Sequence, residues 1–314
     1  MTAETPQIHH EHFLTMLDYT KEELEAIIQL ADKLKIDKKN GIPHPLLEGK
    51  TLAMIFEKSS TRTRVSFEAG MYQLGGNAIF LSKNDIQMGR GESISDTAKV
   101  LSRYADGIMI RAHGHAEVEE LARCANVPVI NGLTDDHHPC QVLADLMTIR
   151  ERFGDYAGRK LVYVGDGNNM AHSLMIGCAI IGMDCAIVTP SGYEPKEEIV
   201  AKARDCSLLS GASIVVGNDP FLEIENADAV YSDVWASMGW EEEADMRKKS
   251  FTPYRVTAEL MAKAKPEAIY LHCLPAHRGE EVDAEVIDGP QSVVFDQAEN
   301  RLHVQKALLA ALLV

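Results

Sequence analysis

Apolar residues recur along this chain at two spacings. Near the N-terminus they return every three or four residues, which places them on one face of a helix. Thr20 and Glu23 precede that face with the spacing of a capping box. The pattern therefore predicts a helix over 21–35, with its apolar face made by Leu24, Ile27, Ile28, Ala31 and Leu34.

Short apolar runs without polar alternation form the second pattern. We predict strands at 51–56, 107–110, 128–130, 160–164, 185–188, 213–216, 229–231, 268–272 and 292–295. Helical patterns lie between them, at 62–75, 93–105, 116–125, 169–182, 196–209 and 257–264. Strands rich in Val and Ile that alternate with helices are typical of parallel sheets covered on both faces. The predicted fold class is therefore α/β, with doubly wound parallel sheets.

One helix marks a domain boundary. Pro139 is favoured at a first helical position, and an apolar pattern continues from it to Ile149 before Gly154 ends the helix. We expect a first domain over 1–149 and a second over 150–297, joined by interdomain helices. The closing helix, 298–314, is too apolar at its end to lie exposed, and we expect it to return to the first domain.

Length and charge narrow the class of protein. The 314 residues allow about two domains. With 47 acidic and 31 basic residues, the net charge is −16, which argues against a nucleic-acid or anionic-membrane partner but allows one local basic pocket. No apolar run approaches a membrane span, and the N-terminus does not resemble a secretory signal. Six scattered cysteines without a Cys-x-x-Cys spacing are expected to be free thiols. We therefore expect a cytoplasmic protein.

The segment Ser59–Arg64 has the composition of an anion site. It follows a predicted strand and opens a predicted helix, whose first N–H groups attract anions, and its hydroxyls and guanidiniums add donors. A plainer interpretation is that Ser60 only caps the helix and Arg64 pairs with Glu68. A cap explains one hydroxyl but not the whole run, so phosphate binding is favoured.

Four further segments carry chemically active side chains. Residues 135–141 contain Asp, His and Cys, which are zinc ligand types, but Pro139 separates them on a helix start, so we expect a His that hydrogen-bonds a ligand oxygen rather than zinc. A partly buried His that only caps the helix fits this segment equally well. Segments 165–169, 233–239 and 271–279 each follow a predicted strand, where the ligand crevice of an open α/β sheet lies. Cys273 is a candidate for chemistry there, although a single cysteine is more often inert packing.

Taken in order, these five segments resemble the transcarbamylase family, and Gly-Asn-Asn-Met with Asp-Val-Trp-Ala-Ser-Met-Gly resembles its ornithine branch. The resemblance covers essentially the whole chain. It implies transfer of the carbamoyl group of carbamoyl phosphate to the δ-amine of L-ornithine, giving L-citrulline and phosphate, in arginine biosynthesis. It also implies no metal and no cofactor, and a homotrimer whose sites lie near subunit interfaces.

The resemblance also implies the roles of individual residues. Arg111, His138, Asp233 and Cys273 would be catalytic. Ornithine would be bound by Asn169, Asp233, Ser237 and Met238. Gln87 would reach the phosphate from a neighbouring subunit. The full carbamoyl phosphate site would comprise Ser60, Thr61, Arg62, Thr63, Gln87, Arg111, His138, Gln141, Cys273, Leu274 and Arg301.

The residue chemistry suits this reaction. Arg62 and Arg111 can neutralise the leaving phosphate, while Thr63, Arg111 and His138 can donate to the carbonyl oxygen as negative charge develops there. An alkylamine must lose a proton to attack, since its ordinary pKa is about 10.4. Asp233 or Cys273 can accept that proton.

Three rival functions differ in testable ways. A putrescine carbamoyltransferase shares stretches such as 278–282, but putrescine lacks the α-amino and carboxylate groups that Asn169, Asp233 and Ser237 are suited to bind. A nicotinamide-dependent oxidoreductase would use Gly165 and Gly167, yet Met170 replaces the third glycine of that motif. A non-catalytic anion-binding relative would not need Cys273 and Asp233.

Overall fold

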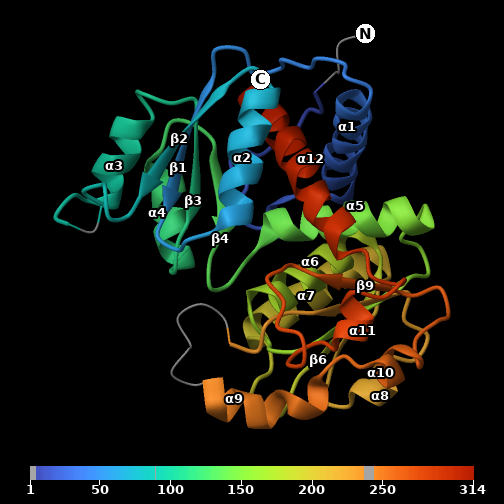
Figure 1. Ribbon diagram of the computed structural model, residues 1–314. Helices are drawn as coiled ribbons and strands as arrows, with labels where there is room; N and C mark the ends of the chain where they lie inside the picture. The colour runs from blue at the N-terminus through green and yellow to red at the C-terminus, as the bar shows by residue number, and fades with distance from the viewer. Residues whose placement is uncertain (1–4, 89, 237–243) are drawn as a thin grey trace. The chain divides into compact units, whose positions relative to one another are not determined.

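The computed structural model describes residues 5–88, 90–236 and 244–314. The chain forms two compact units, each built on its own sheet (Figure 1). Unit 1 comprises Met1–Ala144 and Glu299–Val314, and unit 2 comprises Asp145–Ala298. The division falls inside two helices, α5 (Pro139–Phe153) and α12 (Val294–Leu313). None of the helices in the described ranges is long and apolar enough to cross a bilayer.

Unit 1 contains a four-stranded sheet in the order β2-β1-β3-β4, in which every pairing is parallel. The N-terminal segment adds a bridge between Phe13 and Ile130 at the β4 edge. The strands are β1 (Thr51–Phe56), β2 (Asn77–Ser82), β3 (Gly107–Arg111) and β4 (Val129–Leu133). The helices are η1 (Met16–Asp18), α1 (Lys21–Lys39), α2 (Thr61–Gln73), α3 (Ile94–Leu101), α4 (His115–Cys124) and the unit 1 parts of α5 and α12.

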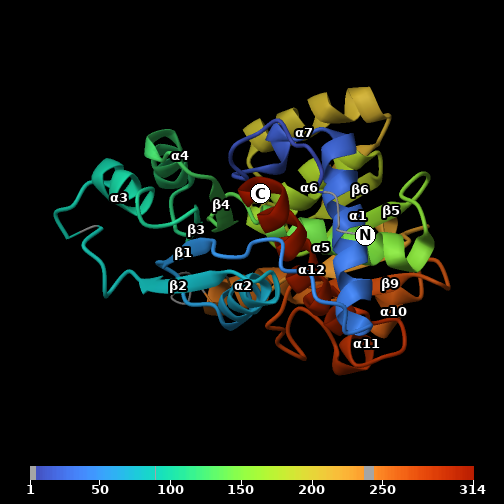
Figure 2. The ribbon, with the colours of Figure 1, turned by 90° about the horizontal axis from the view of Figure 1, so that it is seen from above.

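Helices cover both faces of this sheet. Ala98 of α3 and Val118 of α4 pack with Ile55 and Ile108 on one face. Figure 2 shows α2 and α12 on the opposite side of the strands. A side chain at Gly70 of α2 would meet Lys306 of α12 at 3.3 Å. The close approach of these two helices brings the end of the chain to the same sheet as β1.

Unit 2 contains a five-stranded parallel sheet in the order β7-β6-β5-β8-β9. Its strands are β5 (Lys160–Val164), β6 (Asp184–Val188), β7 (Ile214–Gly217), β8 (Ala229–Ser232) and β9 (Ile269–His272). Its helices, besides parts of α5 and α12, are α6 (Asn169–Ile181), α7 (Glu197–Ser210), α8 (Pro220–Glu223), α9 (Ala244–Phe251), η3 (Thr252–Tyr254), α10 (Ala258–Met261) and α11 (Ala284–Ile287). Leu260 and Val286 pack with Val162 and Val230 on one face, and α6 and α7 lie on the other (Figure 2).

The predicted α/β class with parallel sheets is confirmed, and so are several helix ends. Thr20 and Glu23 form the predicted capping box. Pro139 is the first residue of α5, and Gly154, which follows that helix, has a φ of +84°. This left-handed conformation is one that glycine adopts without strain. All six cysteines are free.

Two strand assignments were wrong. The predicted strand at 292–295 does not form: Ser292 makes an isolated bridge with Tyr270, and α12 begins at Val294. The carbonyl of Val293 accepts the amide of Gln297 at 2.9 Å. This helical hydrogen bond uses the carbonyl that would otherwise pair with a neighbouring strand. Strand β2 was not predicted, although it contains an apolar run at 78–81; it is a partly exposed edge strand.

Lys306 is an unusual member of the unit 1 core. It is fully buried in α12, and its Nζ lies 3.0 Å from both Gln73 Oε1 and His44 Nε2. Burial lowers the pKa of Lys306 to about 8, and the nearby charge of Lys38 acts in the same direction. The ammonium form is therefore less favoured in the folded chain than in the unfolded one.

This difference predicts a pH-dependent stability. Between pH values of about 8 and 10.5, the unfolded chain holds a proton that folded Lys306 has lost, so stability rises with pH across that window. Lys306→Met removes the titration. We expect the unfolding free energy of the wild type to increase relative to the variant from pH 8 to 10 in urea denaturation. A constant difference between the two proteins over this range would contradict the assignment.

Candidate functional site

The N-terminus of α2 has two features that favour an anion. Ser60 caps the helix, and its side chain accepts the amide of Thr63 at 3.2 Å, as the sequence predicts. The first turn contains no acidic residue. Its partial positive charge is therefore not offset by a carboxylate of its own turn.

Arg301 joins three helices of unit 1 at this point. Its Nη2 donates to Thr63 Oγ1 at 2.8 Å and its Nη1 donates to Gln141 Oε1 at 3.0 Å. All three side chains are buried, with exposed fractions of 3% for Arg301 and 0% for the other two residues. Residues from α2, α5 and α12, which lie far apart in the sequence, therefore form one polar cluster with a fixed guanidinium.

Two more predicted residues belong to the same neighbourhood. Arg111 is the last residue of β3, and His138 immediately precedes α5; both are buried. Burial and the charges of Arg301, Arg111 and Arg62 hold the pKa of His138 well below its usual value. His138 is therefore a neutral imidazole at neutral pH, able to donate one hydrogen bond and accept another.

Other predicted residues are less closely tied to this cluster. Thr61 is exposed in the first turn of α2, and Arg62 is partly buried beside it. Gln87 is exposed after β2, where its carbonyl accepts the amide of Arg90 at 2.8 Å. Within the described part of unit 1, no side-chain hydrogen bond of Gln87 joins it to the other site residues. Arg64 instead pairs with Glu68 at 2.9 Å, as the plainer interpretation held.

A supporting ion pair was not predicted. Lys58, which is buried in the turn between β1 and α2, pairs with Asp135. Residues 134–137 form a turn around Asp135, in which the Thr134 hydroxyl accepts the amide of His137 at 3.1 Å. This pair ties the segment that leads to His138 to the turn that leads to Ser60. Asp135 stands in a motif singled out above, but its partner is 77 positions away in the sequence.

In unit 2, a carboxylate and a thiol meet at the carboxyl ends of neighbouring strands. Asp233 follows β8 and Cys273 follows β9; Cys273 Sγ donates to Asp233 Oδ1 at 3.0 Å. The other carboxylate oxygen of Asp233 accepts Asn168 Nδ2 at 3.1 Å. Asn169, the first residue of α6, is partly buried next to Asn168. Ser237 and Met238 lie outside the described residues.

The residues on either side of Cys273 are held firmly. His272 Nδ1 accepts the amide of Leu274 at 2.8 Å, so its Nε2 is the atom that donates to Glu281 Oε1 at 3.2 Å. Both His272 and Glu281 are fully buried in this contact. Leu274 has a φ of +56°, a rare conformation for a residue with a branched side chain. Backbone strain of this kind is concentrated at functional sites.

The ligand atoms of Asp233, His272 and Cys273 lie within 4.8 Å of one another, as in a metal site. Hydrogen bonds account for this closeness: both nitrogens of His272 are engaged by Leu274 and Glu281, and the Cys273 thiol donates to Asp233. Cys273 and Asp233 are thus placed for proton exchange, and His272 holds the backbone of the loop that contains Cys273.

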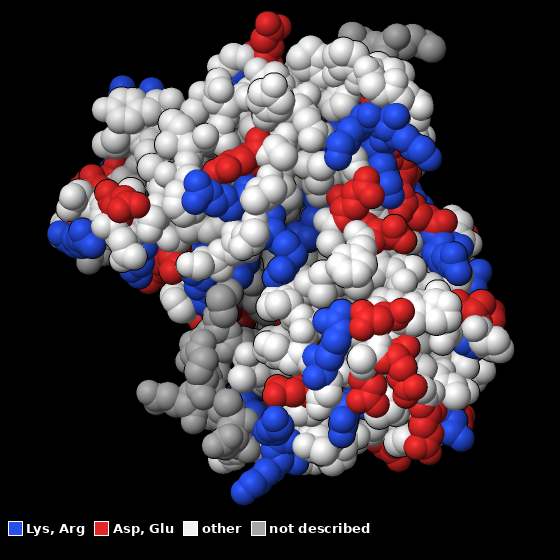
Figure 3. Space-filling model, viewed as in Figure 1, with Lys and Arg blue, Asp and Glu red and all other residues white. Residues whose placement is uncertain are grey.

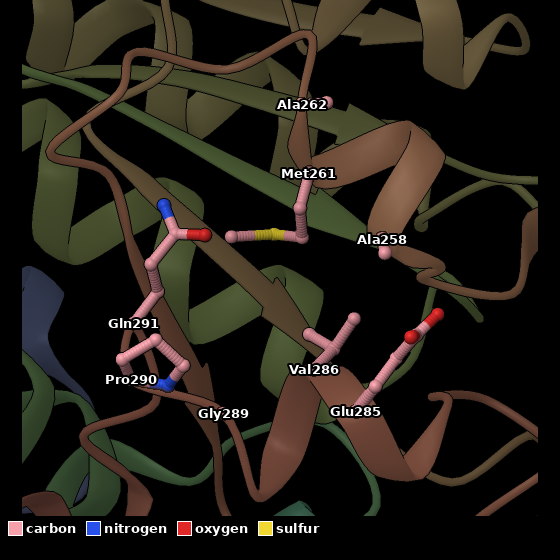
Figure 4. A pocket seen from close by; sticks show the side chains of 8 residues that line it. All are labelled: Ala258, Met261, Ala262, Glu285, Val286, Gly289, Pro290 and Gln291. Atoms are coloured by element: carbon pink, nitrogen blue, oxygen red, sulfur yellow. The ribbon is translucent and has the colours of Figure 1, made fainter.

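The face of the molecule in Figure 3 and one surface hollow among the described residues can be compared with these two clusters. Figure 3 shows basic and acidic side chains interspersed on one face of the molecule. A hollow of about 140 Å³ lies between α10 and α11 in unit 2. Figure 4 shows its lining, in which the methyl end of Met261 is directed toward Gln291. Its eight described lining residues include no basic side chain, so it is unsuited to a phosphate.

The two units therefore carry different chemistry. One α/β unit presents buried cationic groups at a helix N-terminus, and the other presents a carboxylate paired with a thiol, as expected of a group-transfer enzyme with an anionic substrate. Residues 11–151 match the aspartate/ornithine carbamoyltransferase carbamoyl-P binding domain, and residues 157–312 match the aspartate/ornithine carbamoyltransferase Asp/Orn binding domain. The chain belongs to the aspartate/ornithine carbamoyltransferase family.

Individual relatives are similar over nearly their whole length. An ornithine carbamoyltransferase of Anoxybacillus flavithermus is 59% identical over 313 residues, covering 100% of this chain and 99% of the relative. That of Bacillus subtilis is 56% identical and covers 99% and 97%. The solved ornithine carbamoyltransferase of Pyrococcus furiosus superposes with a TM-score of 0.94 at 56% identity, covering 96% of each chain.

The unit 1 cluster predicts where phosphate binds. Arg301→Met should weaken binding of inorganic phosphate by about tenfold to hundredfold, the effect of losing a hydrogen bond to a charged group. Arg64→Gln is the matched control, since Arg64 lies in the same turn as Arg62 but is engaged by Glu68. Isothermal titration at fixed ionic strength measures both. An equal loss in the two variants would mean that only general charge attracts the anion.

Proposed function

We propose that this protein transfers the carbamoyl group of carbamoyl phosphate to the δ-amine of L-ornithine, giving L-citrulline and phosphate. The observation that carries the proposal is the 59% identity with a relative named ornithine carbamoyltransferase over the full chain, both units included. The chemistry of the two clusters agrees with it, since the reaction needs a site for a dianion and a group that accepts a proton.

Carbamoyl phosphate binds to the first domain, residues 1–149 with 298–314. The N-terminus of α2 and the guanidiniums of Arg62 and Arg301 hold the phosphate. Arg111 and neutral His138 donate to the carbonyl oxygen, on which negative charge grows as the amine attacks. The remaining contacts of this ligand come from Ser60, Thr61, Thr63, Gln141, Cys273 and Leu274, and from Gln87 of a neighbouring subunit.

L-Ornithine binds to the second domain, residues 150–297. Asn169, Asp233, Ser237 and the backbone of Met238 hold its α-amino and carboxylate groups, which leaves the δ-amine for attack. The δ-nitrogen forms a bond to the carbonyl carbon, the bond from that carbon to the phosphate oxygen breaks, and the δ-nitrogen gives up a proton. The Asp233 and Cys273 pair accepts that proton. Phosphate leaves with the electron pair of the broken bond.

The setting of the enzyme is also a proposal. The protein works as a homotrimer in the cytoplasm and serves arginine biosynthesis. The trimer requires an exposed side chain at Gln87, because that side chain would complete a neighbour's site, and Gln87 is exposed in its own chain. Sedimentation equilibrium tests the assembly against a chain mass of 34.6 kDa, and a species of one or two chains at micromolar concentration would rule the trimer out.

A colorimetric citrulline assay tests the reaction itself. With carbamoyl phosphate and L-ornithine we expect product that depends on both substrates. Putrescine and L-aspartate in place of ornithine, and NADH oxidation followed by absorbance, are the comparison arms. Carbamoylation of putrescine in preference to ornithine would overturn the assignment, because the α-amino and carboxylate contacts would then have no function.

Cys273 provides a test of the proton path. Cys273→Ser keeps a group of similar size but replaces the thiol that donates to Asp233. We expect kcat to fall by about tenfold or more, in the range of general acid–base effects, while the affinity for carbamoyl phosphate is nearly unchanged. The measurement is steady-state kinetics with both substrates varied over a range of pH. An unchanged pH dependence of kcat would remove Cys273 from the proton path.

A further inference from the structure

Asp233 is held at both of its carboxylate oxygens. Oδ1 accepts the Cys273 thiol at 3.0 Å and the amide of Val234 at 2.8 Å. Oδ2 accepts Asn168 Nδ2 at 3.1 Å. The exposed fraction of Asp233 is 7%. The amide of Asn168 therefore sets the rotation of a nearly buried carboxylate whose opposite oxygen faces the reactive thiol.

The orientation of the Asn168 amide is fixed by the helix that it caps. Its Oδ1 accepts the amides of Met170 at 2.9 Å and Ala171 at 3.4 Å, the first turn of α6. The phenol of Tyr163 contacts the same oxygen at 3.4 Å. Because these N–H groups require an acceptor, the oxygen must face the helix and the NH₂ group must face Asp233.

We propose that Asn168 is a positioning residue for carbamoyl transfer. Its side-chain oxygen caps α6, and its NH₂ group holds Asp233 in line with Cys273. The inference rests on the proposed function and deepens it. Asn169 directly follows Asn168, and both stand at the start of α6. One helix N-terminus thus places a residue that binds ornithine and a residue that orients the proton acceptor.

The capping role and the positioning role are separable by substitution. Serine is as good a cap as asparagine. Its side chain has a single, shorter polar group, which can accept the helix amides but cannot also reach Asp233. Asn168→Ser therefore keeps the cap and loses the bond to Asp233. Asn168→Ala loses both. If Asn168 were only a cap, the serine variant would behave as the wild type.

The experiment compares these two variants with a cap variant elsewhere in unit 2. Thr257 caps α10 and accepts the amide of Leu260 at 3.2 Å. The segment after α10 contacts the start of β8, where the carbonyl of Ala227 accepts the amide of Lys265 at 3.1 Å, whereas Asp233 follows the end of that strand. Thr257→Ala should lower the melting temperature while leaving kcat unchanged. For Asn168→Ser and Asn168→Ala we expect the same loss in kcat/KM for ornithine, about tenfold to hundredfold, although only the alanine variant loses stability. KM for carbamoyl phosphate should not change in either.

Each outcome decides one point. Wild-type protein without citrulline formation overturns the proposed function and, with it, the positioning role. An active wild type with an equally active Asn168→Ser variant overturns the positioning role alone. Loss of activity in the alanine variant but not in the serine variant assigns Asn168 to the cap only, and so does a change in KM for carbamoyl phosphate that follows the melting temperature.

Discussion

The burial of positive charge at the N-terminus of α2 is the constraint on which unit 1 depends. Arg111 and Arg301 are both removed from water. The burial of His138 lowers its pKa, and the charges of Arg301, Arg111 and Arg62 lower it further. Removing charged groups from water is unfavourable unless an opposite charge or strong hydrogen bonds compensate. The dianion proposed as substrate would supply that compensation. The chain as a whole carries a net charge of −16. The local charge at this cluster is positive, which is opposite to that of the whole chain.

Two features of the fold make this cluster possible. The helix α12 brings Arg301 to Thr63 and Gln141 across 238 and 160 positions of sequence. The strands of the sheet are parallel, so the turn after β1, the end of β3 and the loop after β4 all lie at the carboxyl ends of the strands. In unit 2 the same rule places Asp233 beside Cys273, because β8 and β9 are neighbours. The residues proposed for each substrate therefore lie at the carboxyl ends of the strands of one sheet.

Patterns that reflect local physical chemistry were predictable from the sequence. The Thr20 box, the Ser60 cap and Pro139 depend on residues within one turn, and the central strands are marked by unbroken apolar runs. Edge strand β2 and the segment at 292–295 were not predictable, because pairing with a distant strand decides them. The same holds for the Lys58 and Asp135 pair and for Asn168, whose cap is a local signal while its bond to Asp233 is not. The family resemblance supplied the roles of residues that spacing alone left open.

The central claim is that burial and the neighbouring guanidiniums keep His138 a neutral hydrogen-bond donor, and NMR of ¹⁵N-labelled histidine tests it directly. His138→Gln assigns the signal among the twelve histidines. In the free protein the imidazole of His138 should titrate well below its usual range, and inorganic phosphate should raise its pKa because the anion offsets the neighbouring guanidinium charges. A titration near or above the ordinary value of about 6.5, unaffected by phosphate, would contradict the account.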